Sequence, residues 1–220
     1  EVLINIRERL QNAGIEDFEY ESWAFLDWKL HIDRAEFYMN PNGEVKEELL
    51  AELESVLKQR EQRVPLQYLM GECEFMGYDF YVDERVLIPR QDTECLVELA
   101  VEDIRNRKTQ NRCESNNTAD QKNEQKVKVL DLCTGSGCIG ISVAKLCPDT
   151  EVTLADISEG ALSVAKKNAQ NLDAGVTLIK GNLFENIEGR LHFIESTVYP
   201  IRSNRRLDAR SKRTRTATRP

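Results

Sequence analysis

Residues 128–144 combine glycines with a strand-to-helix boundary in an order suited to binding a nucleotide-like ligand. A short apolar run at 129–132, typical of a buried parallel strand, precedes Gly135 and Gly137, and an apolar helical stretch starts near Ile139. Glycine has no Cβ, so the backbone can take positive φ and approach a ligand closely, while the new helix offers N–H groups at its N-terminus. The segment therefore predicts a cradle for a nucleotide-type ligand.

Two features leave the kind of ligand open. Gly135, Gly137 and Gly140 satisfy the dinucleotide fingerprint G-x-G-x-x-G, which would suit a nicotinamide-dependent oxidoreductase. Asp156 ends the next apolar run, where a carboxylate can accept hydrogen bonds from both hydroxyls of a ribose. The glycine turn could also be purely structural and bind no ligand, but the position of Asp156 argues against this alternative.

Asp131 favours a cationic ligand over a dinucleotide. It lies four residues before Gly135, and the resulting D-x-x-x-G-x-G resembles motif I of class I S-adenosylmethionine-dependent methyltransferases. A carboxylate suits a sulfonium with an amino-acid tail better than it suits a pyrophosphate. The resemblance implies that the methionine part of S-adenosylmethionine is held beside Asp131 by Cys133, Thr134, Gly135, Ser136 and Gly137, and that Asp156 holds the ribose.

The elements that must position this loop follow from hydrophobic periodicity. Apolar residues at helical spacing predict helices over much of residues 1–62, with Asp33 as the N-cap of a short third helix. Two aromatic-rich runs about Gly77 predict a β-hairpin. A helix through 96–104 would be capped by Asp92 or Thr93, and the polar stretch 105–126 is expected to be a mobile loop.

After the cradle, strands alternate with helices. A strand at 152–156, a helix from Ser158, a strand at 176–179 and a fourth strand near 191–194 form the doubly wound α/β pattern.

The segment Leu87-Ile88-Pro89-Arg90-Gln91-Asp92-Thr93-Glu94, read together with 131–137, resembles the release factor glutamine methyltransferases (HemK/PrmC). The resemblance covers most of residues 1–188. It implies a helical substrate-recognition domain (1–62), a β-hairpin connector (63–95), a class I methyltransferase domain with a Rossmann-like sheet truncated at its C-terminal end (96–188), and an aberrant tail (189–220).

The same resemblance implies an activity and further site residues. The family uses S-adenosylmethionine to methylate the side-chain amide of the glutamine in the Gly-Gly-Gln motif of peptide-chain release factors. Pro89 and Arg90 would contact that protein substrate. Asn182 and Leu183 would contact the adenine, although Asn182 stands where the family commonly has aspartate.

One family feature is absent. The signature Asn-Pro-Pro-Tyr should follow the fourth strand, but the chain has Ser196-Thr197-Val198-Tyr199, so no catalytic residue is assigned. An Arg-, Ser- and Thr-rich tail follows, which we expect to be disordered. It is either a basic arm that contacts nucleic acid or the ribosome, or an out-of-frame translation, because permitted codons for 196–200 read Asn-Pro-Pro-Tyr in the adjacent frame.

Composition and charge disfavour several classes of function and binding partner. The chain has 220 residues and a net charge of −8, and its basic tail leaves the body still more acidic, which disfavours nucleic-acid binding and a nucleic-acid adenine methyltransferase. Six cysteines without C-x-x-C pairs and two histidines predict reduced thiols and no metal site. We expect a cytoplasmic monomer without membrane segments; a catalytically inactive fragment that still binds release factors is a further alternative.

Overall fold

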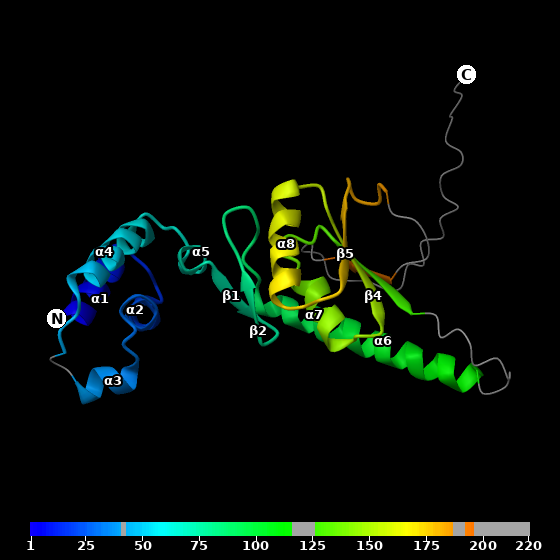
Figure 1. The fold of residues 1–220 in the computed structure, drawn as a ribbon, viewed down its shortest axis with the longest axis horizontal. Coiled ribbons are helices and arrows are strands. Elements are labelled where there is room, and N and C mark those ends of the chain that lie inside the picture. The colour runs from blue at the N-terminus through cyan, green and yellow to red at the C-terminus, as the bar shows by residue number, and fades with distance from the viewer. Residues whose placement is uncertain (41–42, 116–125, 187–191, 196–220) are drawn as a thin grey trace, which may run out of the picture. The chain divides into compact units, whose positions relative to one another are not determined.

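The computed structural model describes residues 1–40, 43–115, 126–186 and 192–195 (Figure 1). The chain divides into two compact units, residues 1–72 and 73–220. Within the described residues, no helix has the length and apolar character needed to cross a membrane. The predicted loop residues 116–125 and the tail from Ser196 lie outside the described residues.

The first unit is helical, as predicted. Its elements are α1 (Val2–Asn12), α2 (Phe18–Phe25), the π-helical turn η1 (Leu26–Leu30), α3 (Arg34–Met39), α4 (Glu47–Glu61) and α5 (Leu66–Met70). Leu3, Ile6 and Leu10 of α1 are buried at helical spacing against Leu53 and Leu57 of α4.

Polar contacts fix the ends and the crossing of these helices. The predicted cap of α3 is confirmed, since Asp33 Oδ1 accepts a hydrogen bond from Glu36 N at 2.8 Å. Arg60 of α4 donates to both carboxylate oxygens of Glu21 in α2, at 2.7 and 2.9 Å, in a nearly buried fork-to-fork ion pair.

The second unit contains a hairpin and a parallel sheet. Its elements are β1 (Glu72–Phe75, which starts at the boundary), β2 (Tyr78–Tyr81), the 3-10 helix η2 (Gln91–Thr93), α6 (Glu94–Ser115), β3 (Val127–Leu132), α7 (Cys138–Leu146), β4 (Thr150–Asp156), α8 (Glu159–Asn171), β5 (Val176–Lys180) and β6 (His192–Glu195). The sheet order is β5-β4-β3-β6 with all pairs parallel, which confirms the α/β class with a Rossmann-like sheet.

Strand order reverses beside β3. From β3 the chain moves outward to β4 and then β5, whereas β6 pairs with the opposite edge of β3. In open α/β sheets, ligands bind beyond the carboxyl ends of the strands at such a switch point. The loop that follows β3, which contains the predicted cradle, is at this place.

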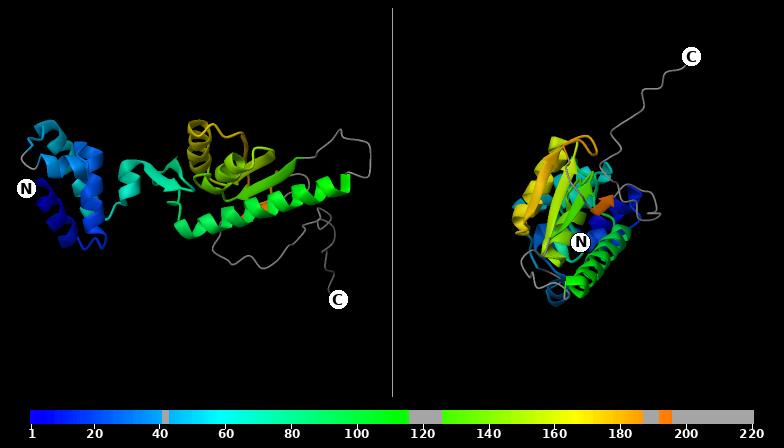
Figure 2. Two further views of the ribbon diagram at one scale, coloured as in Figure 1. Left: turned by 90° about the horizontal axis from the view of Figure 1, so that it is seen from below. Right: turned by 90° about the vertical axis from the view of Figure 1, so that its right-hand side faces the viewer.

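Alternate residues of β3 face opposite sides of the sheet. Val127 and Val129 belong to the core cluster that includes residues of α6, α7 and α8, while Leu130 and Leu132 form a separate cluster with Ala155. Figure 2 shows the three helices alongside the strands. The predicted hairpin is also confirmed, and its Phe75 and Phe80 are buried in the same core as the helices.

Two local predictions were wrong. Neither Asp92 nor Thr93 caps α6, because Thr93 N donates to Arg90 O at 2.9 Å and the resulting turn η2 runs directly into the helix. The predicted loop from Arg105 is helical as far as Ser115, because α6 continues to that residue. There an i,i+4 bond from Arg107 to Asp103 at 2.6 Å supports a helix that has little apolar patterning.

Candidate functional site

The loop between β3 and α7 is a tight turn that backbone hydrogen bonds hold in place. Thr134 N donates to Ala155 O of β4 at 3.0 Å, and Gly137 N donates to Thr134 O at 2.8 Å. Cys133, Gly135 and Gly137 all have positive φ, at 58°, 55° and 82°. The chain can therefore turn from strand to helix within a few residues, as the glycines predicted.

The three glycines of the fingerprint have different surroundings. A Cβ on Gly137 would lie 2.8 Å from Ile141 Cδ1, and one on Gly140 would lie 2.3 Å from Leu154 Cδ2, so both are needed for close packing of α7. A Cβ on Gly135 would meet no atom within 4 Å. Of these three glycines, only Gly135 borders open space, so a ligand in the predicted cradle would lie on its side of the loop.

Asp156 lies beside this opening. Its Oδ2 accepts a hydrogen bond from Gly135 N at 3.0 Å, and its Oδ1 accepts one from Ser158 N at 2.9 Å. Gly181 N at the end of β5 donates to Asp156 O at 3.1 Å. An ionised carboxylate has about four acceptor sites, so this one retains capacity for two further donors such as ribose hydroxyls.

Asp131 is placed differently from an open ligand-binding carboxylate. It is fully buried, and its Oδ2 accepts hydrogen bonds from Thr134 Oγ1 at 2.6 Å and from Gly140 N at 3.0 Å. Its Oδ1 is buried without a hydrogen-bond partner. Asp131 thus ties the loop to the first turn of α7, and the direct ligand contact predicted for it stays a prediction.

The other predicted loop residues divide by exposure. Cys133 is exposed, whereas the side chains of Thr134 and Ser136 are buried. Ser136 therefore faces the protein rather than the opening. The structure brings this loop together with Asp156, as the D-x-x-x-G-x-G interpretation requires.

Apolar side chains lie exposed at the ends of β4 and β5. Leu183 is 50% exposed with φ at 53°, and exposed Asn182 uses its N–H for Glu185 Oε2 at 3.1 Å. Ile157, which sequence reasoning missed, is 64% exposed immediately after Asp156. Its position in the sequence, as a large apolar residue directly after the acid that ends a strand, could have indicated Ile157 as a candidate.

Pro89 and Arg90 lie in the segment between β2 and η2. Pro89 is half-buried, with its carbonyl 3.9 Å from the donor Cys73 Sγ, and Arg90 is exposed. Their contact with a substrate stays a prediction.

Two family models match the chain: the PrmC N-terminal domain over residues 1–71 and the methyltransferase small domain over residues 117–210. A release factor glutamine methyltransferase from Clostridium acetobutylicum is 37% identical over 187 residues, which are 84% of this chain and 60% of that protein. The enzyme of the same name from Geobacter sulfurreducens is 36% identical and covers 81% of this chain and 56% of its own length. Over most of its length, the chain is similar to release factor glutamine methyltransferases.

The chain spans about 60% of the length of these curated relatives. A solved structure, the ribosomal protein L11 methylase of Lactobacillus delbrueckii subsp. bulgaricus, is 26% identical and covers 46% of this chain and 43% of its own, with a TM-score of 0.31. That likeness is too distant to add to the family resemblance.

The end of β6 is the place where the resemblance predicted Asn-Pro-Pro-Tyr. Glu195, the last residue of β6, pairs with Leu132, the last residue of β3, which directly precedes the glycine loop. Ser196-Thr197-Val198-Tyr199 stands there in the sequence and lies outside the described residues.

Burial raises the pKa of Asp131 from 3.8 to about 6, although its hydrogen bonds from Thr134 and Gly140 oppose this. Between about pH 4 and 6 the folded chain keeps a proton that the unfolded chain has lost. The free energy of unfolding should therefore fall by up to about 3 kcal/mol as pH rises through this window, and this component should level off above it.

Asp131→Asn keeps acceptors for Thr134 and Gly140 but cannot ionise, so it should remove this component. Both tryptophans lie in residues 1–72, so unfolding of the second unit is best followed by hydrogen exchange of β3 and β4 across this pH range. The same pH slope in both proteins would contradict the assignment.

Proposed function

We propose that this chain binds S-adenosylmethionine and is the cofactor-binding and substrate-recognition part of a release factor glutamine methyltransferase. The observation that carries the proposal is the Asp156 carboxylate bonded to Gly135 N at 3.0 Å, beside the open face of Gly135. The reaction would methylate the side-chain amide of the glutamine in the Gly-Gly-Gln motif of a peptide-chain release factor, with the chain acting as a monomer.

The residues at the sheet edge fit the parts of this cofactor. The loop from Cys133 to Gly137 would hold the methionine part against backbone N–H groups. Asp156 would accept from the ribose hydroxyls, while Ile157 and Leu183 supply exposed apolar surface for the two faces of an adenine. When bound, S-adenosylmethionine supplies an electrophilic methyl group on a sulfonium.

The substrate side requires positioning more than acid–base chemistry. An amide nitrogen is a poor nucleophile because its lone pair is delocalised, so the family holds it with the asparagine side chain and a proline carbonyl of Asn-Pro-Pro-Tyr. This chain lacks that signature beside β6. We therefore propose that it binds the cofactor but transfers the methyl group slowly.

Titration separates this proposal from a dinucleotide-binding oxidoreductase. S-adenosylhomocysteine at about 100 times its Kd should stabilise the folded chain by about 2.7 kcal/mol and raise its Tm, whereas NAD should leave Tm unchanged. A Tm that rises with NAD, or with neither compound, would contradict the proposed function.

A further inference from the structure

Asn168 of α8 links two segments that are far apart in the sequence. Its Nδ2 donates to Ser136 O of the glycine loop at 2.8 Å and to Tyr81 O of β2 at 2.9 Å. Its Oδ1 accepts from Tyr81 N at 2.7 Å. The Asn168 side chain is completely buried; its bond to Ser136 is buried as well, and its two bonds to Tyr81 are partly buried.

The bond to Ser136 acts on the peptide that shapes the loop. The peptide between Ser136 and Gly137 is held on its N–H side by Thr134 O at 2.8 Å and on its carbonyl side by Asn168. With both groups bonded, this peptide cannot rotate without breaking a buried hydrogen bond. The turn that presents the open face of Gly135 is thereby kept in one conformation.

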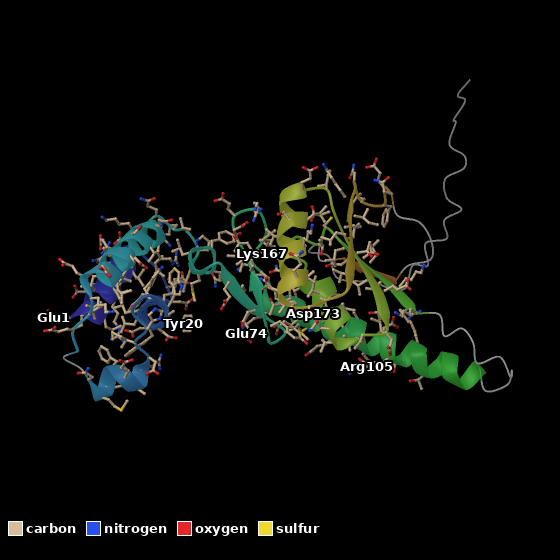
Figure 3. All side chains as sticks on the ribbon, in the orientation of Figure 1. Glu1, Tyr20, Glu74, Arg105, Lys167 and Asp173 are labelled. Atoms are coloured by element: carbon tan, nitrogen blue, oxygen red, sulfur yellow. The ribbon has the colours of Figure 1, made fainter. Side chains whose placement is uncertain are left out.

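The bonds to Tyr81 provide a rigid base. Phe80, next to Tyr81 in β2, is buried in the core of the second unit together with Phe75 of β1. Lys167, which precedes Asn168 on α8 and is labelled in Figure 3, places its Nζ 3.1 Å from the centre of the Tyr81 ring. Asn168 is therefore held by its own helix and by the backbone of the hairpin strand β2.

We propose that Asn168 is a positioning residue that keeps the cofactor loop in its binding conformation by tying the Ser136 carbonyl to the backbone of β2. Asn168 itself would not contact the cofactor; it would affect cofactor binding by holding the loop. The inference rests on the proposed function, because the loop is assigned there to the methionine part of S-adenosylmethionine.

The amide group is well suited to this role. The position requires two donors for two carbonyl groups and one acceptor for an N–H group. Of the neutral side chains, only asparagine and glutamine offer two donors together with an acceptor. Asn168→Asp keeps the shape and the acceptor for Tyr81 N, but it points an oxygen at the two carbonyls. Loop position should therefore be lost while the volume of the side chain is preserved.

The test compares matched variants of the full chain. Asn168→Asp should raise the Kd of S-adenosylhomocysteine about tenfold by calorimetry and speed hydrogen exchange of residues 134–140 in the ligand-free protein. Asn171→Asp, on the exposed end of the same helix, should keep the wild-type Kd. So should Val101→Ala, which opens a cavity in the same core from α6.

Three results would overturn the inference: a wild-type Kd for Asn168→Asp, an equal rise for Val101→Ala, or unchanged loop exchange. If Asn168→Asp does not fold, Asn168→Ser removes bonds without a buried charge and should raise the Kd in the same way. Failure of the wild-type chain to bind S-adenosylhomocysteine would count against the proposed function. Ligand-free exchange in Asn168→Asp and Val101→Ala would still decide whether Asn168 holds the loop.

Discussion

Restoring the reading frame that we infer to be shifted after Glu195, so that Asn-Pro-Pro-Tyr follows β6, is expected to raise methyl transfer to a release factor by about 10³-fold. The physical reason is that the asparagine side chain and the proline carbonyl proposed to hold the glutamine amide, here called the polar clamp, are missing. β6 ends beside the last residue of β3, so a clamp placed directly after Glu195 would start next to the glycine loop. Without it, the nucleophile is neither oriented nor polarised.

The measurement is transfer of a labelled methyl group from S-adenosylmethionine to a release factor that contains Gly-Gly-Gln. A release factor with this glutamine changed to alanine should accept no label. The corrected chain with its new asparagine changed to alanine should lose most of the gain. Equal rates before and after correction, or coding DNA whose adjacent frame does not encode Asn-Pro-Pro-Tyr, would contradict the frame hypothesis.

Asp156→Ala is expected to raise the Kd of S-adenosylhomocysteine about 100-fold. The substitution removes the acceptors proposed for the ribose hydroxyls and also the carboxylate that receives Gly135 N at 3.0 Å. Hydrogen bonds to charged groups contribute about 1.5–3 kcal/mol each, so losing more than one accounts for this factor.

The matched control is Glu151→Ala, on an exposed position near the start of the same strand β4, which should bind as the wild type does. Asp156→Asn should give an intermediate Kd, because the amide retains one oxygen acceptor. Calorimetry on the three variants decides the matter. A Kd for Asp156→Ala within twofold of the wild-type value would exclude the carboxylate from the cofactor site.

Local patterns predicted most of the elements because the rules that govern them act over a few residues. Asp33 was predicted as a cap and is one, and Ser158, where a helix was predicted to begin, caps α8 through a 3.2 Å bond to Ala161 N. The fourth strand was expected near 191–194 and is β6, His192–Glu195. The end of α6 was misjudged because its polar half has no apolar stripe and is supported by an i,i+4 ion pair between Arg107 and Asp103.

Side-chain direction was harder to predict than position. The pattern D-x-x-x-G-x-G located Asp131 at the end of β3 but did not show that it points into the base of α7. That direction follows from the alternation of β3 and from the close approach of Gly140, where an added Cβ would lie 3.0 Å from Asp131 Cβ. Ile157 was missed for the related reason that exposure depends on neighbouring strands.

The order of residues alone predicted the family resemblance, the glycine turn and the acid that ends the next strand, because each depends on contiguous residues with fixed spacing. Only the tertiary structure decided which glycine borders open space and which residues hold the loop. Asn168 and Tyr81 are separated by 87 residues, and their hydrogen bonds exist only because α8 packs against the hairpin. Such long-range pairing leaves no local signal in one sequence.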